Sequence, residues 1–322
     1  MVIDIDNIYK MILFELERNS RISDVKLAKI IKKSKDAVRY RIKKLEEQEI
    51  IKGYKTWVDI SKLGYRTATL YLTLLNIPNR KEELINEIKK DQRVYWLGVA
   101  EGVWNMGVSY FIKSNEELFK IKNSLLSKYE DLIIETKTAS LVSVSVHEKT
   151  FLTKGKSSFI TFTEETGKNE LDQISKNILK ELYNNSKINI AHLASKCKTT
   201  VDIVKNRMKK LENNGIIIKY TTLIDYQKIG YEFYKSFIYL KAYDEEIINK
   251  ILKYVEKSDK IINIVKQVAP WDFEFIIFVK SFQEYNNTIG ELTENFSKVI
   301  RKVETATMSQ DIIFPCNKLI FD

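Results

Sequence analysis

The chain of 322 residues contains little of four residue types that mark particular kinds of protein. With 3 Pro and 10 Gly, it lacks the composition of a long disordered segment. Its 2 Cys, Cys197 and Cys316, are too few for a disulfide framework and have no metal-ligand spacing. Its 2 His, His147 and His192, have no Cys, His or carboxylate constellation around them in sequence. The sequence therefore predicts no metal site, no cofactor and no catalytic residue.

Long hydrophobic runs are missing as well. No stretch approaches the roughly 18 uncharged apolar residues that indicate a transmembrane helix. The N-terminal residues MVIDIDNIYK contain acids where a signal peptide has basic residues. Hydrophobic residues still make up 44% of the chain, which is enough for ordinary cores. We expect a cytoplasmic protein that does not associate with membranes.

One sequence unit occurs twice, 166 residues apart. Residues 3–65 align with residues 169–231 without a gap, and 28 of the 63 aligned pairs are identical. Leu45 and Leu211 are one such pair. A repeat of this length is a duplicated domain, because solenoid units span roughly 20–50 residues. Each copy can therefore be compared with the other.

The excess positive charge of the chain is confined to the repeated unit. The formal net charge is +10. Residues 1–65 contain 15 Lys and Arg against 10 Asp and Glu, and residues 166–231 contain 12 against 6, whereas the remainder contains 26 against 27. A general lysine bias would have made the remainder basic too. Charge restricted to one kind of domain is typical of a module that binds a polyanion.

Each copy of the unit predicts three short helices and a strand pair. In the first copy, apolar residues recur at helical spacing from Ile8 to Leu16, after Asp6 as an N-cap or first-turn acid. A second helix is expected after Ser23 and a third after Ser34. The residues IIKGYKTWVDI then indicate a strand or wing. This order predicts a winged helix-turn-helix domain.

The third helix of each copy has an apolar face and a basic face. Val38, Ile42 and Leu45 form the apolar face in the first copy. A basic outer face is what contact with DNA phosphates requires, although an ordinary solvated helix face would look similar. We predict that both helices bind double-stranded DNA. The predicted DNA-binding residues are Ser34, Lys35, Arg39, Tyr40, Lys43, Lys44, Thr200, Lys205, Asn206, Lys209 and Lys210.

The copies differ at the positions that would contact bases. Arg39 and Tyr40 correspond to Lys205 and Asn206. This difference predicts two non-identical DNA half-sites rather than a perfect palindrome. The helix ends differ too, because Gly215 is replaced by Glu49 in the first copy. Either Glu49 adopts a left-handed backbone at a cost of about 1 kcal/mol, or its helix continues for another turn.

The remainder of each half follows the order strand, helix, strand, strand, helix, strand. This is the ferredoxin-like pattern, and it aligns Trp104 with Trp271 and Glu135 with Glu304. The predicted fold class is therefore α+β, with two winged helix-turn-helix domains each followed by a ferredoxin-like βαββαβ domain. The predicted boundaries are 1–62 and 169–228 for the DNA-binding domains, 63–152 and 229–322 for the ferredoxin-like domains, and 153–168 for a linker.

Several short motifs in the repeated unit belong together as a family pattern. They are Asp6, Ile12-Leu13, Leu16, Asn19, Arg21-Ile22, Leu27-Ala28, Arg41 to Glu46, Ile50-Ile51 and Tyr54, repeated from Asp172 to Tyr220. With the domain order, this pattern resembles the Lrp/AsnC (feast–famine) transcriptional regulators. The resemblance implies a DNA-binding regulator whose ferredoxin-like (RAM) domains pair through their sheets. On one chain, that pairing is intramolecular and yields a pseudo-dimer, which further copies can join through the RAM domains.

In that family, the RAM domain often binds an amino acid through a Gly-x-x-Asp loop near the dimer interface. The corresponding segments here are Gly102 to Asn105 and Ala269 to Asp272, each with one departure from the pattern. The resemblance therefore implies a small-molecule effector such as an amino acid, unless the two Trp simply fill the interface. The candidate effector-binding residues are Gly102, Trp104, Asn105, Trp271 and Asp272.

Three questions remain open in the sequence. Siroheme decarboxylases have the same two-domain layout, so an enzyme of that kind is an alternative, although it would need His or Arg facing a tetrapyrrole. A sensor that does not bind DNA is another alternative. Arg41 and Arg207 belong to the family pattern, but a salt bridge within each domain would explain them equally well.

Overall fold

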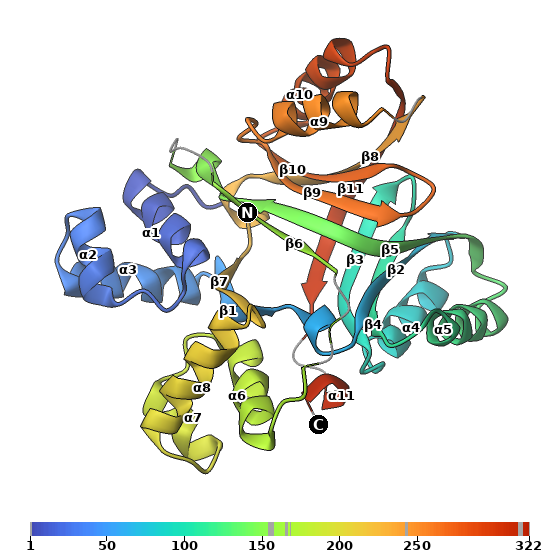
Figure 1. The fold of residues 1–322 in the computed structure, drawn as a ribbon. Helices are drawn as coiled ribbons and strands as arrows, with labels where there is room; N and C mark the ends of the chain where they lie inside the picture. The colour runs from blue at the N-terminus through green and yellow to red at the C-terminus, as the bar shows by residue number, and fades with distance from the viewer. Residues whose placement is uncertain are drawn as a thin grey trace.

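The computed structural model describes residues 2–153, 158–164, 167, 169–241, 244–314 and 318–321. Cys316 and part of the predicted linker lie outside these ranges. Two helix-turn-helix domains lie together on one side of a large β-sheet body (Figure 1). Within the described ranges, no helix is long and apolar enough to cross a membrane.

The two helix-turn-helix domains are built from the same elements in the same order. The first domain contains α1 (Asn7–Arg18), α2 (Asp24–Ile31), α3 (Lys35–Glu47), β1 (Ile51–Val58) and η1 (Ile60–Lys62). The second domain contains α6 (Gln173–Asn184), α7 (Ile190–Lys196), α8 (Val201–Asn213), β7 (Ile217–Ile224) and η3 (Gln227–Ile229). We call helices α1 to α3 the first head and helices α6 to α8 the second head.

Local sequence explains where these helices begin and end. The side chains of Asp6, Ser23 and Ser34 accept backbone N–H groups at the starts of α1, α2 and α3, which confirms the predicted caps. Glu49 follows α3 with φ of 53°, and Gly215 follows α8 with φ of 64°. The left-handed alternative for Glu49 is therefore confirmed, at a position where glycine avoids the steric cost.

The strand that follows each head pairs with the other copy. β1 and β7 form a separate two-stranded antiparallel sheet. The strand pair expected inside each copy is therefore wrong in this detail, because each copy supplies one strand of it. Lys55 lies opposite Thr221, its own counterpart 166 residues later. A pseudo-twofold axis therefore passes through this sheet and relates the two halves of the chain.

Each half continues with the predicted βαββαβ order. In the first half this is β2 (Arg66–Leu74), α4 (Pro78–Ile88), β3 (Val94–Gly102), β4 (Met106–Ile112), α5 (Asn115–Lys128) and β5 (Ile133–His147). In the second half it is β8 (Glu232–Leu240), α9 (Glu245–Val255), β9 (Ile261–Val268), β10 (Phe273–Val279), α10 (Phe282–Asn295) and β11 (Ile300–Ile313). The predicted α+β fold class is confirmed.

The long last strands join the two ferredoxin-like domains. The first part of β5 pairs with β2 of its own half, and the later part pairs with β9 of the other half. β11 does the same with β8 and β3. Because β5 pairs with both β2 and β9, the sheet closes on itself. Three short elements follow these strands: η2 (Thr150–Leu152), β6 (Phe159–Thr163) at the side of β5, and α11 (Lys318–Phe321).

The register of these strands corrects one sequence alignment. Ala139 and Ala306 occupy equivalent positions opposite β2 and β8, so the strands align 167 residues apart. The counterpart of Glu304 is therefore Lys137 and not Glu135. The Lys137 Nζ lies 3.7 Å from a Glu304 carboxylate oxygen. Sequence identity aligned the two glutamates, whereas the hydrogen-bonded pairing decides which residues are equivalent.

The centre of the closed sheet is an aromatic cluster that both halves share. The ring centroids of Tyr71 and its counterpart Phe237 lie 5.6 Å apart. Trp104 and Trp271 pack against this pair, with ring centroids 5.2 Å from Tyr71. All four side chains are buried. Aromatic rings supply large apolar area, so this cluster holds the two halves together.

Each head also packs on a segment of the other half. The core of the first head includes Tyr226, Ile229 and Tyr231, which precede β8. The core of the second head includes Ile60, which precedes β2. Burial of these apolar side chains fixes each head against the body, so the heads are not tethered as free domains.

Candidate nucleic-acid interface

Helix α3 exposes the basic face that the sequence predicted. Its buried side consists of Val38, Ile42 and Leu45. On the other side, the Lys43 side chain is 75% exposed and Tyr40 is 66% exposed. The remaining predicted residues of this helix are also exposed: Lys35, Arg39 and Lys44. The structure therefore brings these side chains together on one accessible face.

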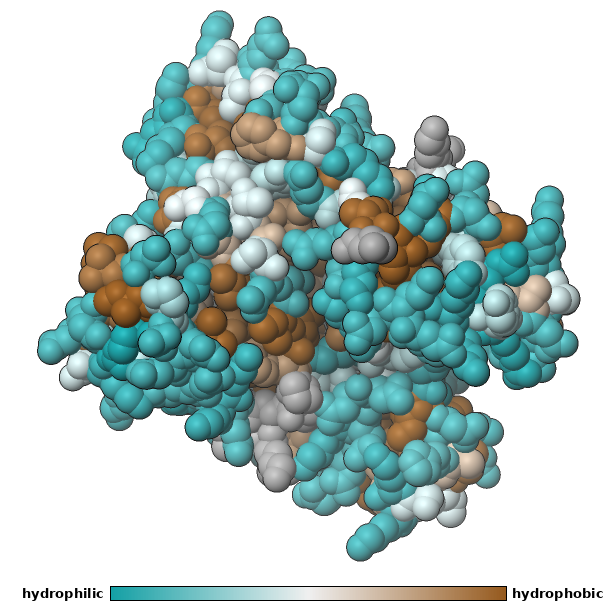
Figure 2. Space-filling view, turned by 180° about the vertical axis from the view of Figure 1, so that it is seen from behind, coloured by the Kyte–Doolittle hydropathy of each residue, from teal (hydrophilic) through white to brown (hydrophobic). Residues whose placement is uncertain are grey.

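Helix α8 exposes a face of different chemistry. Lys205, Asn206, Lys209 and Lys210 are all exposed. Ile203, which is 39% exposed, lies one turn before them. The sequence prediction omitted Ile203 because an isolated apolar residue gives no signal for DNA contact. Figure 2, which shows the opposite side of the molecule, has mainly hydrophilic residues over both heads on the right, with small hydrophobic patches.

Two of the predicted DNA-binding residues lie at the starts of α3 and α8, the third helices of the two heads, which we call the recognition helices. The Ser34 hydroxyl accepts the Ala37 N–H at 3.2 Å, and the Thr200 hydroxyl accepts the Ile203 N–H at 3.3 Å. Both residues are exposed at the helix starts. Their structural role is to cap the helices, and a DNA contact by either stays a prediction.

Arg39 is held by a carboxylate from a different helix. Its Nε lies 2.6 Å from an Asp24 carboxylate oxygen, and the Arg39 side chain remains 56% exposed. Asp24 lies in the first turn of α2. Sequence reasoning missed Asp24, because fifteen positions separate it from Arg39 and only the packing of α2 on α3 joins them.

Arg41 and Arg207 make contacts inside their own domains. The Arg207 Nη2 lies 2.8 Å from a carboxylate oxygen of Asp172, the N-cap of α6. The Arg41 guanidinium lies over the Tyr9 ring and donates to the Ala37 carbonyl oxygen at 3.3 Å. The intradomain salt bridge therefore occurs for Arg207, whereas Arg41 is held within its domain by the Tyr9 ring and a backbone carbonyl oxygen.

The two heads contact each other across the pseudo-twofold axis. Arg21, in the loop between α1 and α2, donates from Nη1 to the carbonyl oxygens of Ser186 at 2.5 Å and Ile188 at 3.1 Å. Its guanidinium also lies 5.5 Å from the centroid of the Tyr220 ring. Tyr220 in turn donates to a carboxylate oxygen of Glu212 on α8 at 2.6 Å. Arg21 thus connects the first head to the recognition helix of the second.

A matching set of contacts runs in the opposite direction. Lys187 is the counterpart of Arg21, and its Nζ lies 4.6 Å from the centroid of the Tyr54 ring. Tyr54 donates a hydrogen bond to the Glu46 carboxylate on α3. Burial and the hydrogen bond to Glu46 raise the pKa of Tyr54, so its hydroxyl keeps the proton that it donates. We call these two sets of contacts the head braces.

The candidate effector residues form structural contacts at the base of the β3–β4 and β9–β10 connections. The Asn105 side-chain oxygen accepts the Leu74 N–H at 2.8 Å, and an Asp272 carboxylate oxygen accepts the Leu240 N–H at 2.8 Å. These are equivalent contacts in the two halves. Asn and Asp can both accept a hydrogen bond here, which explains why Asn105 can stand in place of Asp in the first half.

The other candidate effector residues are closely packed. Gly102 has φ of 124°, and a Cβ there would approach the Thr305 carbonyl oxygen to 2.3 Å. Trp104 and Trp271 fill the shared aromatic cluster, and the Trp271 Nε1 donates to the Gln267 side chain at 3.0 Å. Effector binding by these residues stays a prediction.

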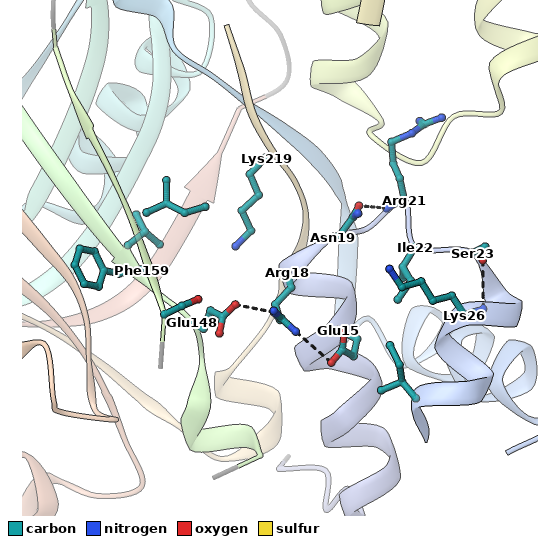
Figure 3. A pocket seen from close by; sticks show the side chains of 14 residues that line it. Glu15, Arg18, Asn19, Arg21, Ile22, Ser23, Lys26, Glu148, Phe159 and Lys219 are labelled. Carbon is teal, nitrogen blue, oxygen red and sulfur yellow. Dashed lines mark hydrogen bonds and ion pairs between the residues drawn. The ribbon is translucent and has the colours of Figure 1, made fainter. Parts of the chain in front are cut away.

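A cleft of about 720 Å³ separates the first head from strands β5 and β6. Figure 3 shows Arg18 in this cleft between Glu15 and Glu148. The Arg18 Nε lies 2.6 Å from a Glu148 carboxylate oxygen, which links the head directly to the end of β5. The cleft is of small-molecule size, and its lining carries cationic as well as acidic side chains.

The two histidines have different surroundings. His192 is exposed on α7, whereas His147 is 1% exposed and stacks on Phe159. Neither ring nitrogen of His147 has a hydrogen-bond partner among the described residues. The described part of the chain contains no group of three or more His, Cys, Asp or Glu that could hold a metal ion.

Comparison with known proteins agrees with this geometry. A family model described as winged helix-turn-helix DNA-binding matches residues 5–52 and 171–218, which contain the two heads. An uncharacterised HTH-type transcriptional regulator of Pyrococcus furiosus is 30% identical over 111 residues, covering 34% of this chain and 72% of that protein. The HTH-type transcriptional regulator LrpA of Pyrococcus abyssi is 30% identical over 126 residues, covering 39% and 89%.

A solved structure shares the fold over nearly the whole chain. It is the siroheme decarboxylase NirDL, with a TM-score of 0.64, 12% sequence identity and coverage of 97% of each chain. This likeness concerns the fold alone, because the sequences have diverged so far. The sequence relatives and the duplicated winged helix-turn-helix domains show that the chain belongs to the Lrp/AsnC family of helix-turn-helix transcriptional regulators, in a tandem form.

Proposed function

We propose that this Lrp/AsnC-type regulator acts as a single-chain pseudo-dimer that binds DNA at two non-identical half-sites. One observation carries the proposal: two exposed basic recognition helices are held as a fixed pair by the head braces. A fixed pair of helices suits two half-sites on one duplex. Because both heads belong to one chain, they need not be identical, as they would be in a homodimer.

The exposed side chains divide into two roles in this proposal. Lys43, Lys44, Lys209 and Lys210 lie furthest along the two helices and are assigned to phosphates. The residues nearer the helix starts are assigned to bases, because the N-terminal part of a recognition helix contacts base edges. They are Lys35, Arg39, Tyr40, Lys205 and Asn206.

The test is DNA binding by the full chain over a series of salt concentrations. A selection from random duplexes first supplies the preferred sequence, and a scrambled duplex of equal length serves as the control. We expect a steep loss of affinity with salt for both duplexes, and a preference of at least about 1000-fold for the selected one. Absent binding, or equal binding to both duplexes, would overturn the proposal in favour of a sensor or scaffold.

The proposal includes a small effector such as an amino acid at the interface of the ferredoxin-like domains. The resemblance of residues 102–105 and 269–272 to the Gly-x-x-Asp loop supports effector binding. The structural contacts that these residues already make, described above, count against it. Thermal unfolding with each of the twenty amino acids tests it. We expect a rise in Tm with one amino acid that is lost in Asn105→Ala. No rise with any of them would contradict the proposed effector.

A catalytic role is the second candidate, favoured by the NirDL-like fold and by Arg18 and Arg21 in the cleft beside the first head. We propose that regulation and not catalysis is the function, since His147 is buried behind Phe159 instead of facing that cleft. Addition of an iron porphyrin with carboxylate side chains, followed by absorption spectroscopy, distinguishes the two. A spectral shift at equimolar porphyrin, lost in Arg18→Gln, would favour the enzyme.

DNA as the target implies an intracellular site of action, and we propose the cytoplasm. We also propose that further copies associate through the ferredoxin-like domains, as the family resemblance implies. Sedimentation at several protein concentrations tests this association, and a constant monomer mass would contradict it.

A further inference from the structure

We propose that the two heads recognise different base pairs: Arg39, positioned by Asp24, reads guanine in one half-site, and Asn206 with Ile203 reads adenine and thymine in the other. This inference rests on the proposed function and deepens it. It concerns which base chemistry each head selects, and it follows from contacts that occur in one head and not in the other.

In the first head, Asp24 holds the Arg39 side chain through a single nitrogen atom, Nε. The Arg39 Nε–H donates a hydrogen bond to an Asp24 carboxylate oxygen, with the two atoms 2.6 Å apart. The two terminal amino groups stay available, and the side chain is 56% exposed. Guanine offers the acceptors O6 and N7 side by side in the major groove, and a planar guanidinium can donate to both. A preorganised arginine loses less side-chain entropy when it makes this pair of bonds.

The second head has no equivalent arrangement. Lys205 takes the place of Arg39, and Ile190 takes the place of Asp24. The Lys205 Nζ lies 4.0 Å from an Asp202 carboxylate oxygen on the same exposed helix. A lysine ammonium on a flexible stem has no planar fork and is not held by a second helix, so its contact with guanine is less preorganised. The second head therefore lacks the guanine reader of the first.

The second head offers an amide and an apolar side chain instead. Asn206 is exposed at the position of Tyr40, and an asparagine amide can both accept from adenine N6 and donate to N7. Ile203 is 39% exposed in the first turn, where the first head has Ala37. An exposed aliphatic side chain on this face matches the thymine methyl group. Val201 adds a second, half-buried aliphatic group at the helix start.

Because of the head braces, the difference between the two heads fixes how the two half-sites are arranged on the DNA. Because the heads are fixed to each other, the guanine-containing half-site and the A·T half-site must occur in one order and at one spacing. The preferred DNA sequence then has a direction. Such a site is what a chain with unlike heads can select and a homodimer cannot.

The experiment combines selection of DNA by the full wild-type chain with competition binding of single-base variants. We expect a G·C pair required in one half-site only, with a loss of about tenfold when it is replaced by A·T. In the other half-site, replacement of A·T by G·C should reduce the affinity by a similar factor. The assignment of heads comes from Arg39→Lys, which should weaken the guanine preference while leaving the salt dependence unchanged.

Asp24→Asn distinguishes the positioning of Arg39 by Asp24 from the effect of the Asp24 negative charge on DNA binding. This change removes a negative charge, so binding to scrambled DNA should stay equal or become tighter. The guanine preference should nevertheless fall, because Arg39 is no longer held. Asp202→Asn removes the same charge from the second head and is the matched control, with the guanine preference expected to stay. Circular dichroism checks that both variants fold.

Three outcomes would overturn the inference. They are two identical half-sites for the wild type, an unchanged guanine preference in both Arg39→Lys and Asp24→Asn, or a guanine preference that depends on Lys205. The second and third outcomes can occur while binding to two unlike half-sites persists, so the proposed function would survive them. Two identical half-sites would also overturn the unlike half-sites of the proposed function, but sequence-specific DNA binding itself would remain. Failure of all specific binding would overturn both, and the salt series with scrambled DNA identifies that case.

Discussion

The hydroxyl groups of Ser20 and Ser186 lie 2.6 Å apart in the buried contact between the two heads. These residues are counterparts, separated by 166 positions, and they meet on the pseudo-twofold axis. Ser186 also lies 3.4 Å from the Thr221 carbonyl oxygen, to which it can donate. The duplication therefore brought two copies of one serine into contact, and each gives the other a hydrogen-bond partner in a site without access to water.

Substitution of these serines should reveal their coupling. Ser186→Ala leaves the Ser20 hydroxyl buried without its partner, so we expect the free energy of unfolding to fall by about 1–2 kcal/mol. Ser20→Ala should have a smaller effect, because Ser186 keeps the Thr221 carbonyl oxygen. The double variant should be at least as stable as Ser186→Ala alone, because it no longer contains the unpartnered Ser20 hydroxyl. Urea unfolding measures all three, and additive effects of the two changes would contradict a direct contact.

Removal of a charge at the far end of either recognition helix should weaken DNA binding regardless of sequence. Lys43→Gln and Lys209→Gln each remove an exposed cation assigned to a phosphate. We expect the slope of log affinity against log salt to become shallower by about 1 in each case. Lys120→Gln on α5, whose side chain is 72% exposed, is the control and should change neither quantity. A change in base preference would reassign the lysine to base contact.

The head braces should make binding sensitive to the spacing of the half-sites. Insertion of a few base pairs between them should reduce the affinity of the wild type by at least about tenfold, because fixed heads cannot follow the rotated half-site. Arg21→Ala removes the contacts to the second head and should lessen this penalty. Arg80→Ala, on α4, changes an arginine away from the heads and should leave the penalty intact. Equal tolerance of all spacings by the wild type would argue against rigid heads.

Acidification should destabilise the protein through His147. Burial, and secondarily the Lys149 ammonium, lowers the pKa of His147 from 6.5 to about 4. Between these values the unfolded chain binds a proton that the folded chain does not, so the free energy of unfolding decreases as the pH is lowered. The loss is at most about 1.4 kcal/mol per pH unit, or roughly 2 kcal/mol at pH 5.

A comparison with His147→Leu isolates this group from other titrations. Glu164 acts in the opposite direction, because burial raises its pKa to about 7 and the stability it contributes below that pH is lost as the pH rises. Glu164 is present in both proteins, so its contribution cancels in the difference. Urea unfolding at pH 7.5 and pH 5 should therefore show the wild type losing roughly 2 kcal/mol relative to the variant. Parallel losses in both would refute the role of His147.

Periodicity and capping residues were sufficient to predict the elements of both halves. The first turn of α3 could be located from Ser34, and its buried face from Val38, Ile42 and Leu45, since these signals act within a few residues. The same local pattern gave the exposed basic side chains of the candidate interface. Ile203 was missed because nothing in its neighbourhood distinguishes an exposed apolar residue on a reading face from an ordinary surface residue.

The sequence by itself determined that the chain is a duplicated helix-turn-helix and ferredoxin-like protein with its positive charge in the heads. The tertiary structure decided which strand pairs with which, as in β1 with β7, and which distant side chains meet, as in Arg39 with Asp24 and Arg21 with Ser186. Helix periods and caps depend on neighbours along the chain. These pairings depend instead on how the two halves pack around the pseudo-twofold axis, where cooperative burial and hydrogen bonding join residues far apart in sequence.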